Sequence, residues 1–140
     1  MYNTKIVKLL KTLDQYEIRQ FKDFVYSPIF NKNENVTKLY NALKKFYPKF
    51  EEDGLTDELI FKQVFPKEKF DYFKLRNAVS DLFSLAKEFL SFLRYRKSNV
   101  IKDKFLLFDL RVRSLDNIFE QAYKTAVKQN EDLKIKPKFV

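Results

Sequence analysis

The sequence predicts an all-α protein, and three observations lead to this class. Glycine occurs once in 140 residues, although sheets and elaborate loops need glycine for their turns. Apolar residues recur every three or four positions along most of the chain, which is the period of one helix face. The second half carries two heptad seams, each typical of a long helix. We expect a bundle of about four shorter helices packed on a long antiparallel helical hairpin.

Two short helices are expected at the start of the chain. The first covers about residues 4–13, where apolar side chains are spaced i, i+3, i+4 and i+7. Asp14 is followed three residues later by Glu17, which is the spacing of a capping box, so the second helix begins there. The buried face of the second helix is expected to hold four apolar residues, namely Ile18, Phe21, Phe24 and Val25.

The stretch FVYSPIFNKNENVTKLY, residues 24–40, interrupts this helical pattern. Pro28 disfavours helical dihedral angles in the residue before it, so the second helix is expected to end near Tyr26. The two apolar residues of the turn, Ile29 and Phe30, are expected to pin it to the core. We interpret the stretch as a structural corner, and a ligand site is the alternative.

Two further short helices follow the corner. Asn33 is suited to cap a helix over about residues 34–47, and Thr56 is suited to cap a short helix that Pro66 closes. The acidic segment EEDGLTDE, residues 51–58, complements the dipole of that short helix within a solvated loop. A metal site is the alternative interpretation of these acids, although their spacing does not match an EF-hand loop.

The two heptad seams predict two long helices. The first seam runs through Tyr72, Leu75, Val79, Leu82, Ala86, Phe89 and Leu93. The second seam is one residue out of phase and runs through Ile101, Phe105, Phe108, Val112, Leu115, Phe119, Ala122 and Ala126. Asn99 lies between the seams and is suited to cap the second helix. We expect two helices that meet at a tight corner and pack antiparallel; one continuous helix is the alternative. A compact six-helix adaptor of the death-fold kind is disfavoured, because the last two helices are too long for it.

The chain is expected to form a single helical domain, as its length favours. Residues 1–70 would form the short-helix bundle, residues 71–130 the hairpin and residues 131–140 a basic tail. The last helix is expected to overhang the bundle, so its apolar residues need a second partner. The predicted protein-interaction residues are Phe105, Leu106, Leu110, Ile118 and Tyr123.

The net charge is +9, and 22 of the 28 basic residues are lysine. Codon bias with ordinary solvation is one interpretation, because readers of phosphates and bases often favour arginine. A functional basic surface is the other. Its candidate nucleic-acid-binding residues crowd one helix–helix corner around Tyr95: Arg94, Arg96, Lys97, Lys102 and Lys104. Dipole complementation at a helix C-terminus and an acidic protein partner are the alternatives for this corner.

Composition excludes several kinds of chemistry. The chain has no cysteine and no histidine, which excludes thiol nucleophiles, disulfides, the usual triads and the commonest metal ligands. It also lacks a glycine-rich phosphate loop. We therefore predict no catalytic residue, cofactor, metal site or small-molecule substrate. No apolar run is long enough to cross a membrane, and the lysine-rich N-terminus lacks a signal-peptide core, so we expect no membrane partner and a cytoplasmic location.

Three segments together resemble one family. They are residues 9–48, residues 55–66 (LTDELIFKQVFP) and residues 73–90 (FKLRNAVSDLFSLAKEFL). In this order, with the Ser-Pro corner, the Tyr-Pro stop and the Phe-Pro end of the short helix, they resemble the N-terminal region of a family of uncharacterised helical bacterial proteins. The resemblance covers most of residues 5–125, and its motifs are corner and core residues, so it implies a fold and no catalytic role.

Members of that family often continue into further helical hairpins. The resemblance therefore implies that these 140 residues are the N-terminal part of a longer protein, or a short member whose last helix binds another partner. The predicted function is that of a non-enzymatic protein-interaction or scaffold module, whose partner is another protein or a second copy of the chain. The alternative is a nucleic-acid-binding protein that uses the basic helix–helix corner.

Overall fold

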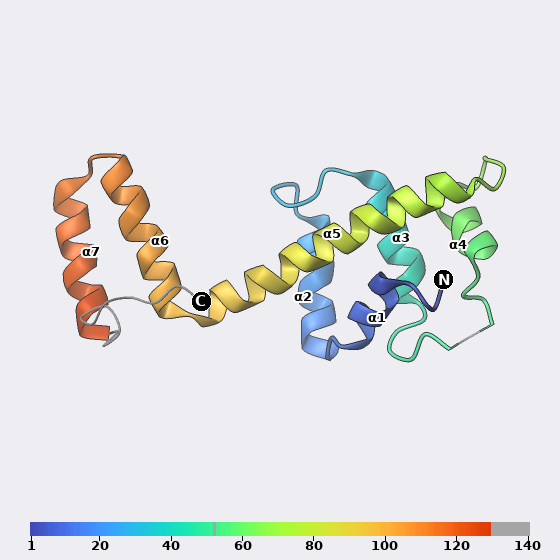
Figure 1. Ribbon diagram of the computed structural model, residues 1–140, viewed down its shortest axis with the longest axis horizontal. Coiled ribbons are helices and arrows are strands. Elements are labelled where there is room, and N and C mark those ends of the chain that lie inside the picture. Colours follow the sequence, from blue (N-terminus) through green and yellow to red (C-terminus); the bar gives the residue numbers. More distant parts are fainter. Residues whose placement is uncertain (52, 130–140) are drawn as a thin grey trace. The chain divides into compact units, whose positions relative to one another are not determined.

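The computed structural model describes residues 1–51 and 53–129 of the chain. These residues are helical in seven segments and contain no strand, so the all-α prediction is confirmed (Figure 1). The helices are α1 (Lys5–Lys11), α2 (Gln15–Tyr26), α3 (Glu34–Lys44), α4 (Asp57–Val64), α5 (Tyr72–Lys97), α6 (Asn99–Val112) and α7 (Asp116–Gln129). The predicted basic tail, residues 131–140, lies outside the described residues.

The chain divides into two compact units, which we call unit 1 (Met1–Leu90) and unit 2 (Ser91–Val140). Unit 1 contains α1 to α4 and most of α5. Unit 2 begins with the last residues of α5 and contains α6 and α7. The predicted packing of a short-helix bundle on a long hairpin involves both units, and it stays a prediction.

Helix starts in unit 1 follow the predicted caps. The Asp14 carboxylate accepts a hydrogen bond from the Glu17 amide at 2.8 Å, and the Glu17 carboxylate accepts one from the Asp14 amide at 3.1 Å. This reciprocal pair confirms the capping box at the start of α2. Asn33 caps α3 and Thr56 caps α4, each by accepting a hydrogen bond from a backbone amide of the first turn.

The corner between α2 and α3 is held by its own side chains. α2 ends at Tyr26, as Pro28 predicted. The Asn31 side-chain amide donates to the Val25 carbonyl at 2.8 Å and to the Thr37 hydroxyl at 3.1 Å. These two bonds tie the end of α2 to the start of α3, which supports the structural interpretation of this stretch.

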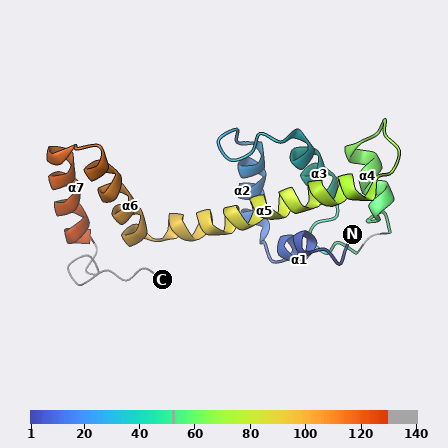
Figure 2. The ribbon, with the colours of Figure 1, turned by 45° about the horizontal axis from the view of Figure 1, so that its top comes forward.

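An aromatic cluster fills the core of unit 1, where both ribbon views place α5 alongside α2 and α3 (Figures 1 and 2). The Phe21 ring lies edge-on to Tyr40, with centroids 5.3 Å apart, and 5.0 Å from Phe89 of α5. Phe24 lies 5.4 Å from Phe89 and stacks on Phe30 at 4.0 Å. Because Phe30 comes from the corner and Phe89 from α5, this cluster joins segments far apart in the sequence.

Two predictions about unit 1 need correction. Ile29 was expected to pin the corner to the core, but its side chain is 86% exposed. In the turn between α2 and α3 two adjacent side chains point in different directions, and Phe30 takes the inward one. α3 ends at Lys44 rather than near residue 47, because the backbone passes into turns before Pro48.

The first heptad seam is buried over most of its length. Leu75, Leu82, Ala86, Phe89 and Leu93 are buried on α5. At the start of the helix the seam residue Tyr72 is half exposed. Val79 is half-buried, so the heptad spacing identified the buried face of α5 except at Tyr72 and Val79.

The prediction of one unbroken last helix is wrong. The chain forms α6 and α7, which lie side by side as a short antiparallel hairpin in both ribbon views (Figures 1 and 2). At the break Ser114 has a φ of 60°, and the Leu115 amide donates to the Leu110 carbonyl at 3.0 Å. The Ser114 amide donates to the Arg111 carbonyl at 3.0 Å. These two bonds form a Schellman motif, which ends a helix with a left-handed residue.

The start of α6 also differs by one residue from the prediction. Asn99 was expected to cap this helix, but Ser98 does so, and its hydroxyl accepts from the Ile101 amide at 3.2 Å. Ser98 has the extended backbone of a cap, with φ −107° and ψ 104°, whereas Asn99 is already helical.

Candidate interaction surface

The second heptad seam leaves an exposed apolar stripe on α6. Phe105, Phe108 and Val112 are spaced i, i+3 and i+7 on α6, so they share one helix face. All three are exposed, Phe108 at 71% and Val112 at 65%, and Leu115 is exposed in the turn that follows α6. We call the three residues on α6 the apolar stripe. At ~1.5 Å rise per residue the stripe extends roughly 10 Å along the helix.

The five predicted protein-interaction residues do not form one surface. Phe105 belongs to the apolar stripe, and Leu106 is exposed on a neighbouring side of α6. Ile118 and Tyr123 are exposed on α7, five positions apart and so on different sides of that helix. Leu110 is only 8% exposed, so its assignment to an outer face needs correction.

Leu110 lies on the side of α6 that is opposite the apolar stripe, and this side is the buried one at Leu110. It is also the residue whose carbonyl closes the Schellman motif with Leu115. Sequence reasoning assigned Phe108 and Val112 to an internal seam and so missed them as surface residues. The heptad spacing itself was the signal that could have found them, since it identifies a face that needs a partner.

The hydrophobic core of the described part of unit 2 is small. Its described residues bury three apolar side chains, which are Leu93, Leu110 and Ala126. Contacts between α6 and α7 include a cation–π pair, in which the Arg111 guanidinium lies 4.7 Å from the Phe119 ring centroid. Half of the large apolar side chains of α6 and α7 are exposed, and of these twelve only Leu110 is buried.

The basic corner lies around the α5–α6 junction of unit 2. Arg94 and Lys97 are exposed in the last turn of α5, and Arg96 lies over the Phe92 ring at 5.8 Å. Lys102 and Lys104 follow in the first turns of α6 and are half-buried. The structure thus places all five predicted cations within one helix–turn–helix segment.

The aromatic residue of the basic corner is already engaged. Tyr95 is half-buried, and its ring stacks on Phe105 with centroids 5.9 Å apart and an interplanar angle of 17°. A base that stacks on Tyr95 would compete with Phe105 for one of its faces. The corner therefore offers charge more readily than it offers an aromatic platform.

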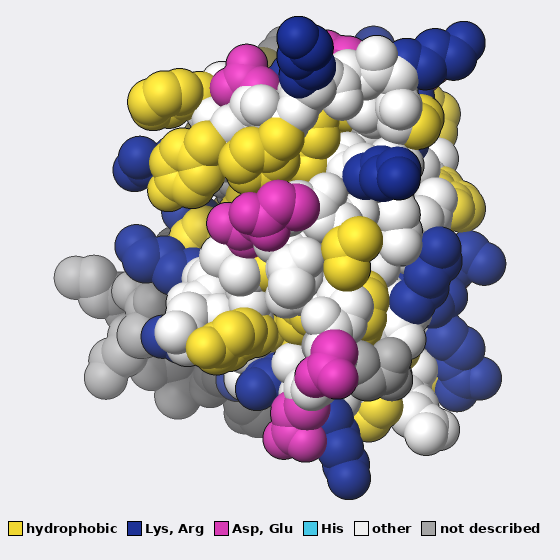
Figure 3. All heavy atoms as spheres, turned by 90° about the vertical axis from the view of Figure 1, so that its right-hand side faces the viewer, with side chains coloured by type: hydrophobic (Ala, Val, Ile, Leu, Met, Phe, Trp, Pro, Cys, Tyr) yellow, Lys and Arg dark blue, Asp and Glu magenta, His cyan; other side chains and the backbone are white. Residues whose placement is uncertain are grey.

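Unit 1 carries a smaller exposed aromatic group at the α4–α5 connection, which sequence reasoning did not single out. Phe70, Tyr72 and Phe73 are exposed there, and the Tyr72 and Phe73 rings lie 5.7 Å apart. Figure 3 views the molecule from the side of α4 and the start of α5, and its hydrophobic side chains are interspersed with charged ones. This group lacks the regular spacing of the apolar stripe.

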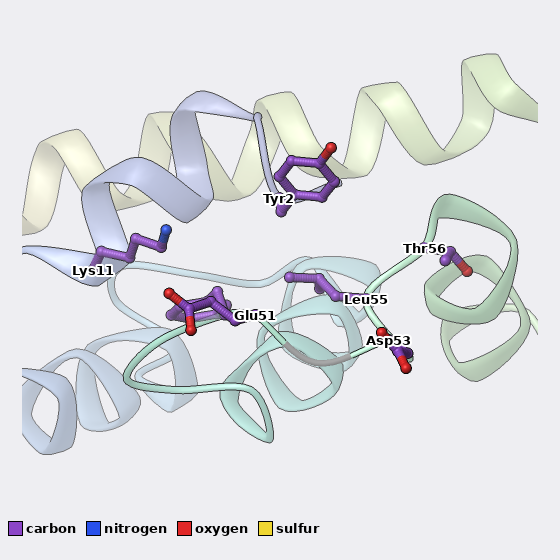
Figure 4. A pocket seen from close by; sticks show the side chains of 7 residues that line it. Tyr2, Lys11, Glu51, Asp53, Leu55 and Thr56 are labelled. Atoms are coloured by element: carbon purple, nitrogen blue, oxygen red, sulfur yellow. The ribbon is translucent and has the colours of Figure 1, made fainter.

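A pocket of about 410 Å³ opens in unit 1 between α1 and the loop that joins α3 to α4. Figure 4 shows Lys11 and Glu51 at one end of the pocket and Asp53 and Thr56 at the other, with Leu55 between them. One cation and two carboxylates around apolar side chains do not define one class of ligand. The pocket therefore carries no functional assignment.

Two further observations bear on the kind of site present. In residues 1–51 and 53–129, no three acidic side chains are grouped as a metal site would need. Over the same residues, every helix is too short or too polar to traverse a lipid bilayer.

No family model, curated protein or solved structure matches the chain. The resemblance to a family of helical bacterial proteins stays a prediction.

Proposed function

We propose that the protein is a non-enzymatic interaction module, and that the apolar stripe on α6 binds a protein partner. The observation that supports this function is the exposure of three large apolar side chains on one helix face. Burying such a side chain completely stabilises a complex by about 1.5–3 kcal/mol. A partner that covers the stripe would therefore gain a substantial part of the binding free energy of a complex with a micromolar dissociation constant.

The regular spacing of the stripe residues distinguishes them from apolar residues that are exposed singly on a surface. Single apolar residues on a surface are normal, and Ile29 in the α2–α3 corner is one of them. Contiguous apolar side chains are less common on monomeric proteins and mark interaction sites. The heptad spacing of the stripe is typical of a helix that packs on another helix.

The test is a selection of helical peptides that bind the full chain, with affinities measured by fluorescence anisotropy. The double variant Phe108→Glu with Val112→Glu is expected to lower the affinity for the selected peptides at least about tenfold, because each change removes ~1.5–3 kcal/mol of apolar burial. Both residues are exposed, so the circular dichroism spectrum is expected to stay unchanged. A variant at Leu110 would be unsuitable, because that side chain is buried.

The matched control is Ile29→Glu with Phe73→Glu, which changes two exposed apolar residues of unit 1 in the same way. The control is expected to bind like the unmodified chain. If stripe and control variants bind the selected peptides equally, the stripe is not the binding site and the proposal fails.

Nucleic-acid binding is the second candidate function. It is favoured by the gathering of Arg94, Arg96 and Lys97 in the last turn of α5, with Lys102 and Lys104 following in α6. Clustered cations of this kind bind phosphate backbones and release counterions. The stacked position of Tyr95 on Phe105 argues for backbone contacts rather than base stacking.

A further inference from the structure

The edges of the apolar stripe are basic. On a helix with a heptad face, the positions beside the face carry the charges that select a partner. Lys104 and Arg111 lie along one edge of the stripe, seven residues apart, and Lys102 lies along the other. The second edge also holds Asp109, which is paired with Arg113 at 2.6 Å.

Asp109 pairs with Arg113, and the other charged residues along the two edges, Lys102, Lys104 and Arg111, all carry a positive formal charge. Charges within a Debye length of ~8–10 Å act on a helix that lies in the stripe. A partner with acidic residues at its own edge positions gains attraction there, and a basic partner is repelled.

We propose that the occupant of the apolar stripe is an acidic amphipathic helix, with apolar residues at heptad spacing and Glu or Asp on either side of them. This proposal rests on the proposed function and names the class of partner. Apolar burial in the stripe would supply affinity, and the basic edges would supply selectivity.

Charge also argues against a second copy of the chain as the occupant. Residues 91–129 carry nine basic and four acidic residues, a net charge of +5. Two copies that meet at their stripes would bring two such charges together across a short distance. Like charges along facing helices destabilise the pair.

The experiment uses the full chain and two synthetic helical peptides of about 21 residues, longer than the ~12–15 residues below which isolated helices are marginal. Both carry leucine at the heptad core positions; one has glutamate at all edge positions and the other has lysine. Fluorescence anisotropy at low salt is expected to show roughly fivefold or tighter binding of the glutamate peptide, and this preference should shrink as salt is raised.

Charge reversal of the edges sharpens the test. Lys102→Glu with Lys104→Glu is expected to invert the preference, so that the lysine peptide binds more tightly. The matched control, Lys124→Glu with Lys128→Glu on α7, changes the net charge equally but lies away from the stripe. It is expected to keep the preference for glutamate. Arg111→Glu is a second edge variant, and it should reduce the preference if the lysine double variant does not fold.

The outcomes separate this proposal from the proposed function. Equal binding of both peptides, lost in the Phe108→Glu with Val112→Glu variant, overturns the acidic partner and leaves the interaction module standing. Binding of neither peptide overturns both. A dimer in sedimentation equilibrium that the same stripe variant abolishes makes a second copy the occupant, and it also overturns the acidic helix.

Discussion

At the scale of single residues, buried polar groups are placed where they can be satisfied. Tyr40 is fully buried, and its hydroxyl donates to the Ile18 carbonyl at 3.2 Å. Burial is the main cause that raises the pKa of the Tyr40 phenol above its ordinary value, with smaller contributions from Tyr26 and Asp23. The neutral phenol therefore belongs to the folded state.

This raised pKa predicts a loss of stability at alkaline pH. An unfolded tyrosine ionises near pH ~10, whereas folded Tyr40 stays protonated there. The folded state then binds more protons, so the contribution of Tyr40 is complete below about pH 10 and is lost as pH rises further. We expect Tyr40→Phe to lose about 1 kcal/mol at neutral pH, through its missing hydrogen bond, but to decline less steeply above pH ~10.

Urea unfolding at a series of pH values measures this difference. Tyr16→Phe is the matched control, because Tyr16 is exposed and its removal should leave the alkaline decline unchanged. Parallel pH profiles for Tyr40→Phe and the unmodified chain would contradict the assignment.

At the scale of helices and their connections, two residues other than glycine adopt left-handed backbone. Phe50 and Ser114 both have positive φ, at 53° and 60°. The single glycine, Gly54, has no positive φ. A left-handed conformation is costly for residues other than glycine. At Ser114 it is held by the hydrogen bonds of the Schellman motif, and at Phe50, in the loop after α3, by burial and a hydrogen bond from its amide to the Phe46 carbonyl.

The Schellman motif of α6 predicts a stabilising substitution. Ser114→Gly is expected to raise the free energy of unfolding by about 0.5–1 kcal/mol, because glycine adopts the left-handed conformation without strain. Ser84→Gly, at an exposed site inside α5, is the matched control and is expected to lower stability by about 0.5–1 kcal/mol. Chemical denaturation measures both. Destabilisation of similar size at both positions would show that Ser114 is not held in the left-handed region.

At the scale of the whole molecule, burial and charge are distributed unevenly. Unit 1 buries an aromatic core, whereas the described part of unit 2 buries three apolar residues and exposes its heptad stripe. The chain as a whole carries a net charge of +9. A charge of this size attracts polyanions, so specific contacts have to be separated from general attraction.

The basic corner predicts salt-dependent binding of duplex DNA or RNA if it is a nucleic-acid site. Fluorescence anisotropy between ~50 and ~200 mM salt gives the number of phosphates contacted, since each contributes about 0.9 to the slope of log affinity against log salt. Arg94→Glu with Arg96→Glu is expected to weaken binding and reduce the slope. Lys5→Glu with Lys8→Glu, two exposed lysines of α1, changes the net charge equally. Equal weakening by both variants would assign the binding to general charge, and the corner would lose its role.

The local features of the fold could be read from the sequence because they depend on neighbouring residues. The capping box of Asp14 and Glu17, the end of α2 before Pro28 and the cap at Thr56 all act over one helical turn. The face of α5 that is buried followed from heptad spacing alone. For the candidate surface, the sequence predicted Phe105 but placed Leu110 outside and Phe108 inside.

The sequence by itself therefore determined the helical class, most helix starts and which residues share a face. Only the tertiary structure decided where the last helix breaks and which of its faces is covered. The break at Ser114 depends on a left-handed residue that is not glycine, so no local signal marked it. Periodicity shows that Phe105, Phe108 and Val112 lie together, but burial depends on whether another segment packs there. On α5 that segment is present in the core of unit 1, and on α6 the same heptad pattern faces outward.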